Sequence, residues 1–267
     1  MSLSNLFLKH YLPVWAIALN SFRDALRNKV LGGLLGLSFM VIGIGSLMGE
    51  MSLHNEVRVA TNSGIFLTTL FAVVMGVYAS VTLFHTELER RTIYTLLSKP
   101  IDHWHFLLGK FLGVSAISAT VVVVLGVTSG SLVVFQGGSL NSTFLAAYFM
   151  AFLQSTVVAS LTILFATFSG SLVAGISAFT LFVAGNLHTQ MEMAIEHFRE
   201  TTPSIVPVLN AVKFALPNFE AMNLSYELTY GTAVPLNYWV TALWYASSYI
   251  ALVLMISIFI FSRKDFQ

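Results

Sequence analysis

Six apolar runs, each close to the length that a helix needs to cross a lipid bilayer, constrain the fold of this chain more than any other feature. A helix spans the hydrocarbon core with about 20 mostly apolar residues. Since 56% of the residues are hydrophobic and only 9% are charged, against about 25% charged in soluble domains, we predict an all-α integral membrane protein with six transmembrane helices. The predicted spans are Val30–Gly49, Gly64–Phe84, Phe106–Phe135, Phe144–Phe168, Leu172–Leu187 and Trp239–Phe261.

The fifth predicted span is the shortest, and only the sequence FSGS, Phe168–Ser171, separates it from the fourth. A tight turn between two full spans is one interpretation of this spacing. A hairpin that stays shallow in the membrane is the other.

Lysine and arginine gather on one side of this arrangement, and cytoplasmic loops are the ones enriched in these residues. We therefore predict a multi-pass protein of a bacterial inner (cytoplasmic) membrane with both termini in the cytoplasm. The net charge is only +1, which leaves no overall basic surface for nucleic acid. The cytoplasmic set is Lys9, Arg23, Arg27, Lys29, Arg90, Arg91, Lys99, Lys110, Arg263 and Lys264, and the other side has Arg58, Arg199 and Lys213.

Residues 1–29 precede the first span and are expected on the cytoplasmic side. From Pro13 to Lys29 the spacing allows one apolar face and one charged face, which is typical of a helix lying in the membrane interface. An extension of the first span fits the same periodicity. The expected apolar face consists of Trp15, Ile17, Ala18, Phe22, Ala25 and Leu26.

The most polar break between the apolar runs is HTELERRTIYTLLSKPIDHWHFLLGK, His85 to Lys110. Thr86 followed by Glu89 has the pattern of a capping box, which predicts that a helix begins there, and Pro100 disfavours helix at the residue before it. The pattern predicts a short amphipathic cytoplasmic helix between spans two and three. The alternative is a polar loop whose charges serve only membrane topology. The apolar stripe of the helix would be Leu88, Ile93, Leu96 and Leu97.

This stretch, ELERRTIYTLLSKPIDHWHFLLGKF, resembles the cytoplasmic loop of type-2 ATP-binding-cassette exporter permeases, in particular the branch associated with multicopper-enzyme maturation. The similarity extends to AIALNSFRDALRNKVL near the start, LPNFEAMNL before the last span and the ending FSRKDF. It implies a transmembrane subunit whose coupling helix docks on a separate cytoplasmic ATPase subunit, with a second permease subunit in a homodimer or a homologous heterodimer. The residues it assigns to ATPase coupling are Glu87, Glu89, Arg90, Arg91, Thr95, Leu96 and Pro100.

The resemblance further implies a single transmembrane permease domain over residues 1–267. Within it, residues 86–105 form the cytoplasmic coupling loop, and residues 188–238 form an extracytoplasmic segment with a part that dips into the membrane before the last span. The family's function, export of a cargo along a pathway between two such subunits, is the expectation that follows.

The chain itself has no motif for ATP hydrolysis, because LLGKF, Leu107–Phe111, lacks the earlier glycine and the following hydroxyl of a phosphate-binding loop. We expect no enzymatic activity, no cofactor and no metal site. Histidine and methionine lie near each other in MGEMSLH and HTQMEMAIEH, but methionine is also an ordinary apolar residue at helix ends. The alternative function is a non-catalytic membrane anchor or scaffold subunit of a cell-envelope complex. Nothing in the sequence selects a cargo.

Overall fold

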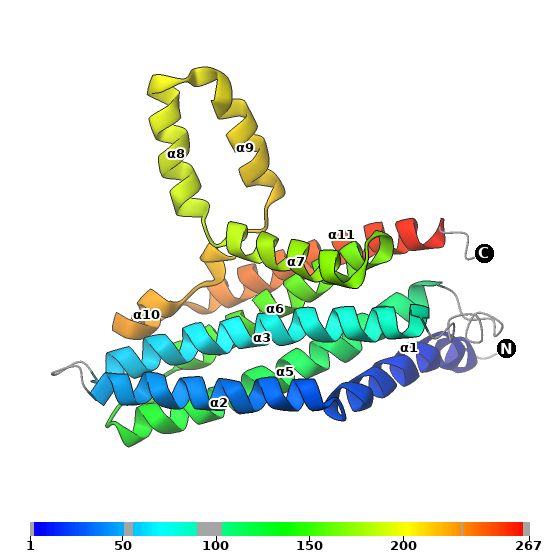
Figure 1. The fold of residues 1–267 in the computed structure, drawn as a ribbon, viewed down its shortest axis with the longest axis horizontal. Coiled ribbons are helices and arrows are strands. Elements are labelled where there is room, and N and C mark those ends of the chain that lie inside the picture. Colours follow the sequence, from blue (N-terminus) through cyan, green and yellow to red (C-terminus); the bar gives the residue numbers. More distant parts are fainter. Residues whose placement is uncertain (1–2, 51–55, 90–102, 231, 264–267) are drawn as a thin grey trace.

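The computed structural model describes residues 3–50, 56–89, 103–230 and 232–263, and every regular element in these ranges is a helix. Six helices run side by side and form the bundle (Figure 1). Helix α1 (Leu3–Leu26) begins, and α11 ends, at the same end of this bundle. The bundle helices are α2 (Lys29–Glu50), α3 (Glu56–Glu89), α5 (His103–Phe135), α6 (Ser142–Phe168), α7 (Ser171–Gly185) and α11 (Leu236–Ser262).

Four of these helices are long and apolar enough to cross a membrane alone: α3, α5, α6 and α11. Two further spans are obtained if each of two bent pairs is counted as one, namely α1 with α2, bent by 63°, and α7 with α8 (His188–Thr201), bent by 66°. The described chain is therefore a multi-pass helical membrane protein with four to six spans. The six predicted runs coincide with bundle helices, since hydropathy along a sequence is a local property.

The prediction that a new helix begins at Thr86 is wrong. Helix α3 continues without a break through Thr86 to Glu89, whereas an N-cap residue lies outside the helical conformation. The preceding His85 contributes to this continuity, because its Nδ1 contacts the carbonyl oxygen of Val81 at 3.2 Å and its Nε2 contacts that of Ser169 at 3.2 Å. The second contact ties the end of α3 to the turn between α6 and α7.

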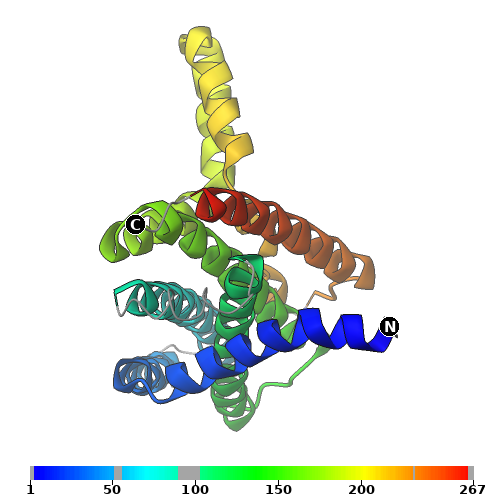
Figure 2. The same cartoon turned by 90° about the vertical axis from the view of Figure 1, so that its right-hand side faces the viewer.

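Helix α1 crosses the bundle at an angle and packs on α5 (Figure 2). It begins at Leu3, earlier than the predicted start, and Pro13 lies inside it. Of the predicted apolar face, Ala18 and Ala25 are buried, whereas Trp15 is 67% exposed. The face that α1 buries on α5 is narrow, and Gly109 and Gly113 of α5 bring the two backbones close together there. The position of this helix in the membrane interface stays a prediction.

This close approach predicts a specific defect. A Cβ atom at Gly113 would lie 2.6 Å from Cβ of Ser21 and 3.0 Å from the carbonyl oxygen of Ala18. Gly113→Ala should therefore move α1 away from α5 and cost about 1–3 kcal/mol, as overpacking does. Thermal unfolding of the purified protein measures this cost. The matched control is Gly36→Ala, since a Cβ there meets nothing within 4 Å; an equal loss in both variants would contradict the prediction.

Helix α6 forms the centre of the bundle and is buried along almost its whole length. Its polar side chains bond inside the protein: Ser155 Oγ donates to the carbonyl oxygen of Ala72 at 2.8 Å and lies 2.9 Å from Ser118 Oγ. Gly76 of α3 makes room for this contact, because a Cβ there would lie 2.9 Å from Ser155 Oγ. These hydrogen bonds join α3, α5 and α6 where no water is available to replace them.

Candidate functional site

The residues predicted to couple the chain to an ATPase fall mostly outside the described ranges. Glu87 and Glu89 lie in the last turn of α3. The remaining predicted residues, Arg90, Arg91, Thr95, Leu96 and Pro100, lie outside the described residues. The structure thus describes only the helices that lead into and out of this segment.

An aromatic cluster joins these helices at the end of the bundle where α3 ends and α5 begins. The ring of Phe261 in α11 stacks on Phe106 of α5, with centroids 5.9 Å apart, and meets the edge of Phe84 of α3 at 5.8 Å. His103 packs against Phe261 as well, at 5.6 Å. Because Phe84 and Phe261 are each only 1% exposed, the cluster sets the relative positions of α3, α5 and α11 at this end of the bundle.

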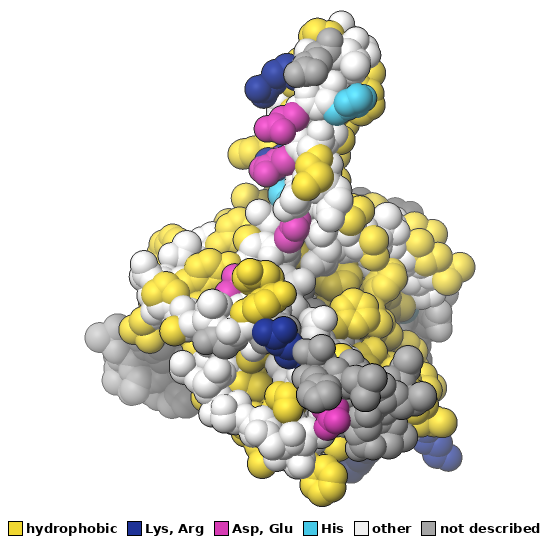
Figure 3. All heavy atoms as spheres, turned by 90° about the vertical axis from the view of Figure 1, so that its left-hand side faces the viewer, with side chains coloured by type: hydrophobic (Ala, Val, Ile, Leu, Met, Phe, Trp, Pro, Cys, Tyr) yellow, Lys and Arg dark blue, Asp and Glu magenta, His cyan; other side chains and the backbone are white. Residues whose placement is uncertain are grey.

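A helical hairpin, made of α8 and α9 (Val206–Ala215) with the short helix η1 (Pro203–Ile205) between them, stands out from the side of the bundle (Figure 1). Lys213 of α9 forms an ion pair with Glu192 of α8. Acidic side chains are visible along the hairpin when the molecule is viewed from the end of the bundle opposite α1 (Figure 3). In contrast, α9 buries none of its residues, and its Phe214 is 94% exposed.

A cavity of about 490 Å³ lies between α3, α6 and α7, beside the base of the hairpin. The chain returns to this base through η2 (Glu220–Met222) and α10 (Ser225–Tyr230). Apolar side chains from α3 and α7 line one part of the cavity, and polar side chains line the rest. The polar set is Thr69, Gln154, Asn186, Gln190, Glu220, Asn223 and Ser225.

Glu220 closes the base of the hairpin by binding the first turn of α8. Its Oε2 accepts a hydrogen bond of 2.8 Å from the backbone N–H of Thr189, where the dipole of α8 also favours a negative charge. This hydrogen bond, aided by the nearby His188, lowers the pKa of Glu220 from its usual value of 4.5. Glu220 is therefore ionised at neutral pH and contributes a fixed negative charge to the cavity.

The lowered pKa gives stability a pH dependence. The folded state binds the Glu220 proton less tightly than the unfolded state, so the contribution of Glu220 is present above the usual pKa of 4.5 and is lost as the pH falls through the lowered folded-state pKa. We expect Glu220→Gln to lower the melting temperature at neutral pH. The melting temperature of the variant should also fall less in acid than that of the unaltered protein. Thermal unfolding of both proteins across this pH range measures the effect. Parallel curves for the two proteins would contradict it.

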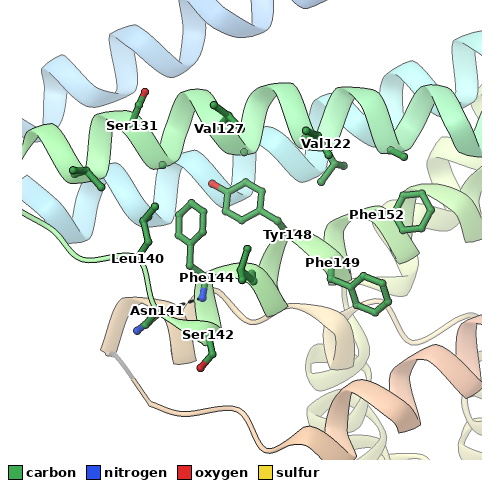
Figure 4. A pocket seen from close by; sticks show the side chains of 16 residues that line it. Val122, Val127, Ser131, Leu140, Asn141, Ser142, Phe144, Tyr148, Phe149 and Phe152 are labelled. Atoms are coloured by element: carbon green, nitrogen blue, oxygen red, sulfur yellow. Dashed lines mark hydrogen bonds between the residues drawn. The ribbon is translucent and has the colours of Figure 1, made fainter.

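A second hollow, of about 1210 Å³, lies between α5 and α6. Phe144 and Tyr148 of α6 point toward α5 there (Figure 4), over Gly130 and Gly126, where a Cβ would lie 3.1 Å and 2.9 Å from the two rings. Ser131 is among the few polar residues in its lining, which otherwise consists mostly of valine, leucine and phenylalanine. An apolar groove of this kind suits lipid chains, whereas the α3–α6–α7 cavity can also hold polar groups.

Ligand sites often lie between the helices of a bundle, and here a partly polar cavity lies between α3, α6 and α7 of a membrane-crossing bundle. The sequence matches the family described as ABC-2 family transporter protein over residues 15–266, and the chain belongs to that family. It is thus a transmembrane permease of the ATP-binding-cassette type, and such permeases in general associate with an ATPase subunit. Among curated proteins, none matches the sequence.

The polar lining of the cavity was largely missed by sequence reasoning. Gln154 carried a signal, because an amide inside an apolar run is costly unless it bonds to a neighbouring helix or faces a polar space. Asn186 and Glu220 carried none, since Asn186 lies at the end of the predicted run Leu172–Leu187 and Glu220 lies between predicted runs, where polar residues are ordinary. Asn186 and Glu220 come together with Gln154 because of where the helices end and how they pack, and this is decided by the tertiary structure.

Proposed function

We propose that this chain is the permease subunit of an ATP-binding-cassette exporter that is driven by a separate cytoplasmic ATPase. The observation that carries the proposal is membership of the ABC-2 transporter family over residues 15–266. In the proposed arrangement, two such subunits form the pathway, both termini are cytoplasmic, and the chain lies in a bacterial inner membrane. The multicopper-enzyme-maturation branch remains a prediction from the sequence.

The segment between α3 and α5 is the proposed docking site for the ATPase. The segment starts at the last turn of α3, where Glu87 and Glu89 lie, and continues through Arg90 and Arg91. Support comes from the helices that lead into and out of the segment, because the aromatic cluster of Phe84, Phe106 and Phe261 connects α3, α5 and α11 at the end where α3 stops and α5 begins. A force applied to this segment would reach α3, α5 and α11 together.

The hairpin of α8 and α9 is proposed as the membrane-dipping part of residues 188–238. Support comes from α9, whose exposed Val208 and Phe214 have no protein cover, and from the direction of the hairpin across the bundle (Figure 1). Apolar side chains that project sideways from a membrane domain are stabilised by contact with lipid. Lys213, paired with Glu192, keeps its charge toward α8.

The double reversal Arg90→Glu with Arg91→Glu should weaken binding of the partner ATPase by about tenfold or more, because repelled charges at an interface cost several kcal/mol. The measurement is the amount of ATPase that co-purifies with the tagged permease. The matched control is Arg199→Glu on the hairpin, which should have no effect. Thr95 and Pro100 would be altered in a second round.

Leu96→Asp separates docking from folding, because a charge placed in the apolar stripe should lower the yield of folded permease instead. If the amount of co-purified ATPase were unchanged after the double reversal, the coupling assignment would be contradicted, and the charges of the segment would serve only membrane topology. If no ATPase co-purifies with the unaltered chain, the scaffold function is favoured.

A further inference from the structure

Two amides of the α3–α6–α7 cavity, those of the buried Gln154 and the half-buried Asn186, use their nitrogen atoms inside the protein. Gln154 donates from Nε2 to the carbonyl oxygen of Phe219 at 3.4 Å, and Asn186 donates from Nδ2 to the carbonyl oxygen of Phe182 at 2.9 Å. A carbonyl oxygen can only accept, so each amide must present its NH₂ group to the backbone. Among the described residues, neither amide oxygen accepts a hydrogen bond, and both residues line the cavity.

The other polar groups of the lining add to this surplus of acceptors. Thr69 donates its hydroxyl proton to the carbonyl oxygen of Ile65 at 2.9 Å, which leaves the oxygen able to accept. The carboxylate of Glu220 has only acceptor atoms when it is ionised. Asn223 and Gln190 are exceptions. The Oδ1 of Asn223 accepts from Ser225, which leaves its NH₂ group as a donor, and Gln190 in the lining carries a further NH₂ group.

The charge of the cavity lining also favours a ligand that donates hydrogen bonds. Among the lining residues, all of which the structure describes, Glu220 is the one charged side chain. Lys213, on the neighbouring hairpin, is paired with Glu192. No lining residue is a cation that would offset Glu220 for an anionic group, and His188 lies outside the lining, whereas a cationic donor would find a partner in Glu220.

The remaining lining provides a place for an apolar body. Phe66 of α3 and Phe179 and Phe182 of α7 contribute aromatic rings, together with Ile65 and Leu70. Aromatic faces also attract cations when water is excluded. A cavity of about 490 Å³ has the size of an ordinary small-molecule site.

We propose that this cavity binds an amphiphile with a protonated amine, whose ammonium group donates hydrogen bonds to Glu220, Gln154 and Asn186 while its apolar body lies against Phe66, Phe179 and Phe182. The proposal names the cargo class of the permease and thus rests on the function proposed above. The cavity selects against anionic amphiphiles because Glu220 repels a negative charge and because the NH₂ groups of Gln154 and Asn186 already donate to the backbone.

The test uses the full chain in phosphatidylcholine nanodiscs and two fluorescent probes. Dansylcadaverine has an aromatic body and a primary ammonium, and dansyl-aminohexanoate has the same body and a carboxylate. Binding is measured by fluorescence anisotropy, with empty nanodiscs subtracted. Dansylcadaverine should bind at least about tenfold more tightly, the difference expected for hydrogen bonds to a charged group. Equal affinities, or no binding of either probe, would overturn the proposal.

Four variants locate the binding. Glu220→Gln and Gln154→Leu should each weaken the binding of dansylcadaverine by about tenfold. Ser131→Ala in the α5–α6 groove should leave this binding unchanged. Glu220→Lys should invert the preference toward the carboxylate probe, and such a gain of binding cannot come from misfolding. An unchanged preference in Glu220→Lys would overturn the proposal. Co-purification of the ATPase is measured separately, so failure of the cargo assignment is distinguishable from failure of the permease function.

Discussion

Phe261→Ala is expected to destabilise the protein by about 3–5 kcal/mol, the usual cost of removing a buried phenylalanine. Phe261 is 1% exposed and packs against Phe84, Phe106 and His103. Its removal would leave a space between α3, α5 and α11, and each lost aromatic pair adds about 0.5–1.5 kcal/mol. Unfolding of the detergent-purified protein by heat or by a denaturing detergent measures the loss.

Phe259→Ala is the matched control for this substitution. Phe259 lies on the same helix, two positions earlier, but is 56% exposed, and its recorded contact is with the guanidinium of Arg263 at 4.1 Å. The same atoms are removed without creating a buried space, so little stability should be lost. Similar losses in the two variants would show that the aromatic cluster does not hold this end of the bundle together. Phe261→Leu, which refills part of the space, should recover part of the loss.

Gly185→Ala is expected to separate α7 from the chain that returns beneath the hairpin. A Cβ atom at Gly185 would lie 2.4 Å from the carbonyl oxygen of Pro217 and 2.6 Å from Cδ2 of Phe219. The first neighbour is backbone and cannot rotate away, so the clash must move a whole segment. The backbone N–H of Phe219 also donates to the carbonyl oxygen of Gly185 at 3.0 Å. We expect a cost of about 1–3 kcal/mol, as for other overpacked contacts.

The same substitution should also alter the cavity, because Phe219 accepts the hydrogen bond of Gln154 and precedes Glu220. Dansylcadaverine binding should therefore fall together with stability. Gly43→Ala is the control, since a Cβ there meets nothing within 4 Å. If Gly185→Ala left both stability and probe binding at the level of Gly43→Ala, the close contact between α7 and Pro217 would be contradicted.

The sequence by itself determined the helices of the bundle. The predicted runs Phe106–Phe135 and Phe144–Phe168 coincide with α5 (His103–Phe135) and α6 (Ser142–Phe168) to within three residues. Hydropathy decides such helices locally, because an apolar run in a bilayer must satisfy its backbone hydrogen bonds within itself. The local signal was weaker at helix ends: a capping pattern at Thr86 predicted a start where α3 simply continues.

Only the tertiary structure decided which polar groups meet. Gln154, Asn186 and Glu220 belong to three different elements, and they line one cavity because α7 ends at Gly185 and the chain returns at Phe219. The glycine that permits this return has no distinguishing feature in the sequence, and neither does Gly113, which admits α1. Contacts between residues far apart along the chain depend on how helices pack, and packing is not encoded in any single apolar run.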